Sequence, residues 1–143
     1  MAMAMNDPRP EPRPKVPDSE KITVNLGFVD LGHIDLMVRD GFYANRADFI
    51  RTAVRNQIER QGEAVKQSVS RKQLRLGLSY YSKQTLEAAR DSGTPIHIQV
   101  LGLASIALDV TPELARAAIA SVEVLGAFQA SPAVKAALAD RIT

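Results

Sequence analysis

The stretch KITVNL, Lys21 to Leu26, alternates polar and apolar residues. In a β-strand, alternate side chains point to opposite faces. The apolar face of this strand would carry Ile22, Val24 and Leu26. The polar face would carry Lys21, Thr23 and Asn25. Two helical patterns follow the strand before any second strand, so we expect its pairing partner to come from another chain.

The first helical pattern runs from about Val29 to Asp40, and Gly41 stands where a helix commonly ends in a left-handed residue. The second pattern runs to about Arg60. Asn45 is a good N-cap for it, and Asp48 complements the positive end of the helix. The predicted unit, Glu20 to Gln61, is near the lower size limit at which a chain folds alone without disulfides or metal. Oligomerisation is therefore the expected source of its stability.

The composition is that of a soluble globular protein: 143 residues, 45% hydrophobic and 24% charged, without cysteine. The absence of cysteine excludes disulfides and thiolate metal sites and favours a reducing cytoplasm. We find neither a signal peptide core nor a membrane span, and expect no membrane partner. The net charge of +2 is small, so contacts with nucleic acid would depend on individually placed residues.

Two segments flank the predicted helical unit. Met1 to Ser19 holds five of the eight prolines and few large apolar residues, which predicts a disordered or extended arm. Residues 62–73 are polar, and they are either a linker or a continuation of the second helix.

Residues 74–143 alternate strand-like and helix-like segments and contain an internal repeat. VLGLAS recurs as VLGAFQAS, and TPELARAAI recurs as SPAVKAAL; LGLSYYSKQTLEAA is a weaker earlier copy. The expected helix caps are Ser82, Thr111 and Ser131. Repeats of this size favour a solenoid-like stack of strand–helix units. The same order of elements also allows a ferredoxin-like sheet. The chain as a whole is expected to be α+β.

Pairing of two copies of the strand would form a two-stranded antiparallel ribbon with its polar face exposed. Such a ribbon fits the major groove of B-DNA. Asparagine can pair with the edge of adenine, lysine with guanine, and threonine with either base. The strand is therefore a candidate for reading a DNA sequence.

The residues that follow strengthen this interpretation. In DGFYANRADFIRTAVR a glycine ends one helix, a polar cap opens the next, and an apolar pair follows. Residues 20–61 resemble the ribbon-helix-helix superfamily of prokaryotic DNA-binding repressors. The resemblance implies an intertwined homodimer in which Lys21, Thr23 and Asn25 read base edges. It also implies that the start of the second helix, at Asn45, Arg46 and Ala47, binds a phosphate, in keeping with the affinity of helix N-termini for anions.

Two features depart from the usual pattern of these repressors. The junction between strand and helix reads LGFVDLG in place of a proline-acidic turn, and no strand position is an arginine. Both departures leave the operator sequence open.

Enzymatic chemistry is not expected. His33 and His97 are the only histidines, they lie in different segments, and no cysteine accompanies them, so no metal site is predicted. We find no phosphate-binding loop and no nucleophile motif. No cofactor is expected.

The leading hypothesis is a nucleoid-associated, cytoplasmic repressor that binds double-stranded DNA as a dimer or higher oligomer. Residues 74–143 would serve oligomerisation or bind an unknown protein partner. The alternatives are an antitoxin of a toxin–antitoxin pair, a polymerising scaffold protein and a small-molecule sensor. The apolar, regular character of residues 74–143 argues against the antitoxin, since antitoxin tails of this kind tend to be polar and disordered.

Overall fold

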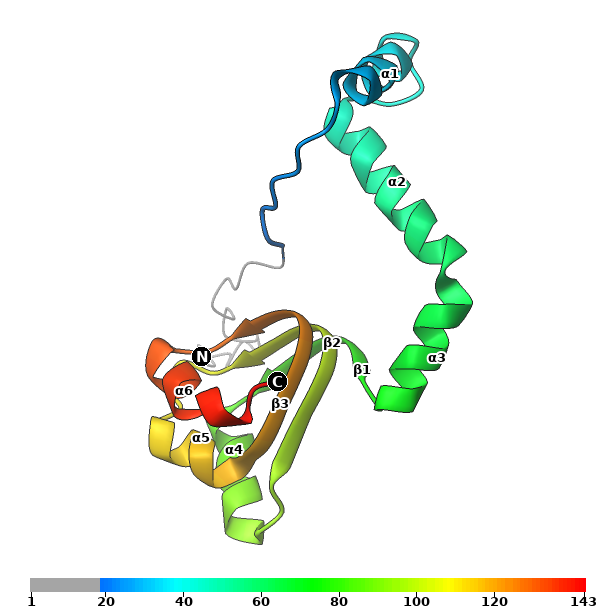
Figure 1. Ribbon diagram of the computed structural model, residues 1–143. Coiled ribbons are helices and arrows are strands. Elements are labelled where there is room, and N and C mark those ends of the chain that lie inside the picture. Colours follow the sequence, from blue (N-terminus) through cyan, green and yellow to red (C-terminus); the bar gives the residue numbers. More distant parts are fainter. Residues whose placement is uncertain (1–18) are drawn as a thin grey trace, which may run out of the picture.

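The computed structural model describes residues 19–143 (Figure 1), so the arm expected at Met1 to Ser19 lies almost entirely outside the described residues. The described chain begins with an extended segment and continues through six α-helices, three strands and one short 3-10 helix. Their bounds are α1 (Phe28–Arg39), α2 (Arg46–Arg60), α3 (Gly62–Lys72), β1 (Arg75–Tyr81), α4 (Lys83–Ser92), β2 (Ile96–Ile106), α5 (Pro112–Ala118), β3 (Ile119–Gln129), α6 (Pro132–Ala137) and η1 (Ala139–Arg141).

Helices α1 and α2 form where the sequence predicts them. Gly41 adopts a φ of +83°, and the N–H of Phe42 reaches back to the carbonyl of Met37 at 3.0 Å, which together end α1 in a Schellman motif. The turn then places the Tyr43 ring edge-on to the Phe49 ring, with centroids 5.0 Å apart. This contact packs the loop against the first turns of α2.

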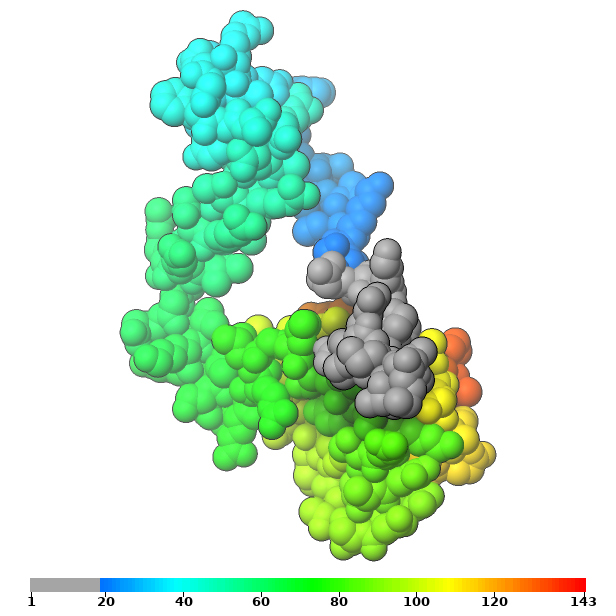
Figure 2. All heavy atoms as spheres, turned by 180° about the vertical axis from the view of Figure 1, so that it is seen from behind, coloured from blue at the N-terminus to red at the C-terminus, as the bar shows by residue number. Residues whose placement is uncertain are grey.

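Residues 62–73 continue the helical path. Helix α3 follows α2 after a single interruption at Gln61, so most of this segment is helical. The helix ends at Gln73, which takes the left-handed conformation at φ 55°. In Figures 1 and 2, α2 and α3 form a bent arm, and α1 and α2 stand away from the sheet.

The remaining strands form a three-stranded, all-parallel sheet in the order β1-β2-β3. Each strand is followed by a helix, and α4, α5 and α6 stack in sequence on one face of the sheet (Figure 1). A ferredoxin-like order needs two strands joined directly to each other, which the helix after every strand excludes. The arrangement is a stack of strand–helix units, as the internal repeat favours.

Glycine is required where the three strands bend together. Gly77, Gly102 and Gly126 are direct neighbours across the sheet, and all three have φ between +114° and +138°. A Cβ on Gly102 would lie 2.2 Å from the carbonyl oxygen of Gly77, and one on Gly126 would lie 2.1 Å from that of Gly102. Strand β2 runs unbroken through Gly102.

The hydrophobic core lies between the sheet and its three helices. Its largest fully buried side chains are Leu86, Ile98, Ile119, Leu138, Val100, Val122 and Val134. The hydroxyls of Ser82, Thr111 and Ser131 accept hydrogen bonds from the backbone N–H three residues ahead, which confirms all three predicted caps. Each cap fixes where a helix begins and hence which residues it turns toward the sheet.

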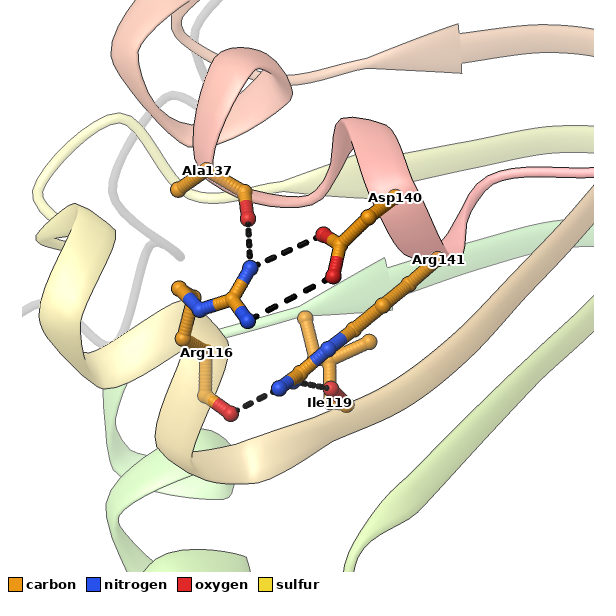
Figure 3. Close-up of polar contacts among 5 residues, drawn as sticks. All are labelled: Arg116, Ile119, Ala137, Asp140 and Arg141. Atoms are coloured by element: carbon orange, nitrogen blue, oxygen red, sulfur yellow. Dashed lines mark hydrogen bonds and ion pairs between the residues drawn. The ribbon is translucent and has the colours of Figure 1, made fainter.

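Two arginines secure the last turn of the chain (Figure 3). Arg116 donates to the carbonyl of Ala137 at 2.6 Å and to the carboxylate of Asp140 at 2.8 Å. Arg141 donates in return to the carbonyls of Arg116 and Ile119. The following residues lie along β3, where the N–H of Thr143 donates to the carbonyl of Val122 at 2.9 Å.

Candidate nucleic-acid interface

The segment predicted as a strand, Lys21 to Leu26, is extended but pairs with no strand among residues 19–143. A strand needs a neighbour for its backbone hydrogen bonds, and residues 19–143 of the same chain supply none. The predicted strand is therefore not formed within the described part of one chain. Its apolar side chains are correspondingly open, with Ile22 exposed by 77% and Val24 by 67%.

An apolar groove of about 1030 Å³ lies between this segment and helices α1 and α2. It is lined by Ile22, Val24, Leu26, Ile34, Met37, Phe49, Ile50 and Val54, among others. Ile34 is the only buried hydrophobic residue between positions 19 and 73. One buried side chain cannot stabilise a unit of this size, so the groove is an incomplete core.

The predicted base-reading residues Lys21, Thr23 and Asn25 are all exposed. Lys21 and Thr23 also line the apolar groove, so the single chain does not separate a polar face from an apolar one. Such a separation requires the regular pleat of a paired strand.

The N-terminus of α2 is built as predicted from Asn45. Its side-chain oxygen accepts the N–H of Asp48 at 2.8 Å, and the Asp48 carboxylate accepts the N–H of Ala44 at 2.9 Å. The next two N–H groups, of Arg46 and Ala47, belong to exposed residues and have no acceptor among residues 19–143. Two free donors at the positive end of a helix form a site that attracts an anion.

The side chain of Arg46 makes a contact that the sequence does not reveal. Its guanidinium donates two hydrogen bonds of 2.8 Å to the carboxylate of Asp35 on α1. The hydrogen bond from Arg46 lowers the pKa of Asp35, and the carboxylate in turn raises the pKa of Arg46. The arginine thus joins α1 to α2, and the donors left free at the start of α2 are backbone N–H groups.

Two other kinds of site, a metal centre and a membrane span, concern the remaining side chains and helices. In the described part of the chain, no group of three or more His, Cys, Asp or Glu side chains is placed to hold a metal ion. His33 lines the apolar groove, and the Nδ1 atom of His97 lies 2.8 Å from the hydroxyl of Ser121 on the sheet. None of the helices within residues 19–143 is both long and apolar enough to cross a membrane.

Comparison with known proteins identifies one family. The description of the matching family is Ribbon-Helix-Helix transcriptional regulator, and the match covers residues 17–135. It therefore extends well beyond the 20–61 unit and takes in most of the strand–helix repeats. No curated protein and no solved structure matches the chain. With most of its length matched, the chain belongs to the ribbon-helix-helix family of transcriptional regulators.

Proposed function

We propose that two copies of the chain pair their Lys21–Leu26 segments antiparallel and insert the resulting ribbon into the major groove of DNA. The observation that carries this proposal is the extended, unpaired segment lying over an incomplete apolar core. A second copy supplies both missing parts at once, namely a strand for the backbone hydrogen bonds and apolar side chains for the groove. The resulting homodimer acts as a repressor by occupying its operator.

Sequence reading is assigned to Lys21, Thr23 and Asn25. Once the strand is paired, these three side chains share the face opposite to the apolar residues. Asparagine offers both a donor and an acceptor to adenine, lysine donates to guanine, and the threonine methyl group packs on thymine. The two-fold axis of the dimer presents each side chain twice, so we expect an operator with two-fold symmetry.

Positioning on the DNA backbone is assigned to the start of α2. A phosphate oxygen would accept the free N–H groups of Arg46 and Ala47, with Asn45 holding the helix start in place. The guanidinium of Arg46 is already paired with Asp35 and contributes by fixing α2 on α1.

Residues 74–143 are assigned to oligomerisation or to binding a partner protein. A stack of repeats has an end at each terminal strand, and such ends expose surface unless they are capped. Contacts between these ends would join copies of the chain to one another. The folded, apolar repeat favours this role over that of an antitoxin tail.

The test is genome-wide mapping of the DNA bound by the wild type and by a T23A/N25A double variant. We expect the wild type to select a defined set of sites and the variant to lose that selection while remaining dimeric. The matched control, N56A/T94A, removes the same two side-chain types at exposed positions elsewhere. Unchanged site selection by T23A/N25A would rule out base reading by the strand.

A further inference from the structure

The two edges of the sheet are not equivalent. Along β3, Ile142 forms a bridge with Val122 and the N–H of Thr143 donates to the Val122 carbonyl, so the chain itself occupies part of that edge. Strand β1 pairs with β2 on one side and has no strand on its other side within residues 19–143. Natural proteins usually protect such an edge with lysine or proline. The β1 sequence RLGLSYY has neither, and its one charge is Arg75.

The side chains of β1 also indicate a missing neighbour. Leu76, Leu78 and Tyr80 point to the face of the sheet that carries no helix, and they are exposed by 70%, 77% and 56%. Their counterparts in β2 are Leu101, Leu103 and Ser105, which are half-buried or buried. Within residues 19–143, strand β2 has neighbours on both sides and β1 has only one. The apolar row is therefore left open at the edge where the sheet stops.

We propose that β1 pairs antiparallel with β1 of a second copy, about a two-fold axis at Leu78, to form a continuous sheet through both copies. In this register Leu78 lies opposite the Leu78 of the other copy, and Leu76 lies opposite Tyr80. Apolar side chains that face each other directly across two strands stabilise a sheet. Arg75 falls opposite Tyr81, so the register brings no like charges together. The strand is thus complementary to itself.

The alternative arrangement stacks β1 of one copy on β3 of the next, in the parallel sense of the intrachain sheet. That arrangement would place Leu76 beside the Leu125 of the neighbouring copy, in the register of the existing repeat. It needs the edge of β3, where the Val122 carbonyl already accepts the N–H of Thr143. Pairing through β1 meets no such obstacle among the described residues. It closes as a dimer, whereas stacking continues into a filament.

The exposed apolar area of β1 determines whether the contact can form between two separate copies. The exposed parts of Leu76, Leu78 and Tyr80 amount to roughly 350 Å² per copy, about 700 Å² for the pair, which is less than a stable free-standing interface buries. The contact therefore forms between copies that are already tethered, because a tether raises their effective concentration. In this respect the inference rests on the proposed function, whose ribbon supplies the tether.

The test uses single cysteines in the full-length chain, which has none of its own. In L78C, the two cysteines face each other at a separation that a disulfide can span. In L76C, the two identical cysteines are offset by four residues, about 13 Å, which is too far. We expect L78C to form a covalent dimer on mild oxidation and L76C alone to remain unlinked. L76C co-expressed with Y80C, under different tags, should cross-link, which establishes the register.

The controls separate this inference from the proposed ribbon. Circular dichroism checks the fold of each variant, and light scattering under reducing conditions reports the non-covalent oligomer. A reduced L78C dimer that does not cross-link would overturn the β1 contact while the ribbon proposal stands. A monomer that does not cross-link would overturn both. Cross-linking of co-expressed L76C and L125C would overturn the two-fold register in favour of head-to-tail stacking.

Discussion

Replacement of Gly102 by alanine introduces a carbon atom where the carbonyl of the neighbouring strand lies. The new Cβ would be 2.2 Å from the oxygen and 3.0 Å from the carbon of the Gly77 carbonyl. Both atoms belong to the backbone of β1, so no side chain can rotate away to make room. Gly102 also has a φ of +138°, a conformation that residues with a side chain rarely adopt.

Each of the two effects has a typical magnitude. The backbone conformation costs about 1–3 kcal/mol for a residue other than glycine. Crowding of an extra carbon into a packed site costs about another 1–3 kcal/mol. We therefore expect G102A to lower the free energy of unfolding by about 2–6 kcal/mol, against a total of about 5–15 kcal/mol for an ordinary domain.

Two other glycines provide matched controls. A Cβ on Gly77 meets nothing within 4 Å although φ is +114°, so G77A should lose only the backbone part, about 1–3 kcal/mol. Gly32 lies inside α1 with nothing within 4 Å of its Cβ, so G32A should stabilise the chain by up to about 1 kcal/mol. Urea denaturation followed by far-UV circular dichroism ranks the three variants. Equal stability of G102A and G77A would refute the close approach of the strands.

Two further predictions concern single polar contacts. N45A removes the cap of α2 and should lower the free energy of unfolding, measured by urea denaturation, by about 1 kcal/mol. It should also weaken DNA binding, measured by fluorescence anisotropy. If both values are unchanged, Asn45 does not act as the cap. Hydrogen bonding from Arg116 lowers the pKa of Asp140. The pair therefore stabilises the fold at a pH above the ordinary carboxyl pKa. This stabilisation is lost as the pH falls through the lower pKa of the folded state. D140N should therefore lose less stability in acid than the wild type, measured as melting temperature against pH. Identical pH profiles for D140N and the wild type would contradict the contact.

The repeat part of the fold was predictable because its determinants are local. Ser82, Thr111 and Ser131 cap helices through a backbone group only three residues away. The recurrence of VLG with a capped helix start predicts units that stack, and the parallel sheet follows from stacking. Glycine, as at Gly102, weakens a strand on its own. Here the glycines of three neighbouring strands adopt the same bend and keep the sheet intact.

The parts that escaped prediction depend on contacts between distant residues or between chains. The position of Arg46 at a helix start predicts a phosphate-binding residue. Its pairing with Asp35 depends on how α1 crosses α2, which no local pattern specifies. The alternation of Leu76, Leu78 and Tyr80 predicts a strand but does not say whether its apolar face lies on the core; in the structure that face is open.

The segment from Lys21 to Leu26 is a different case. Its pattern predicts a strand, and a strand exists only when it is paired. Within one chain the segment has no partner among the described residues, so the prediction concerns the assembly and not the isolated chain. The family match agrees with the class of protein, and the pairing itself stays a proposal.

Hydrogen exchange of the backbone amides of residues 21–26 tests the central claim most directly. A paired ribbon protects alternate amides of this segment, and dilution below the dimer dissociation constant removes the protection. We predict slow exchange at high protein concentration, fast exchange on dilution, and renewed protection when operator DNA is added. Fast exchange of all six amides at every concentration, in protein that still binds its DNA sites, would contradict the account.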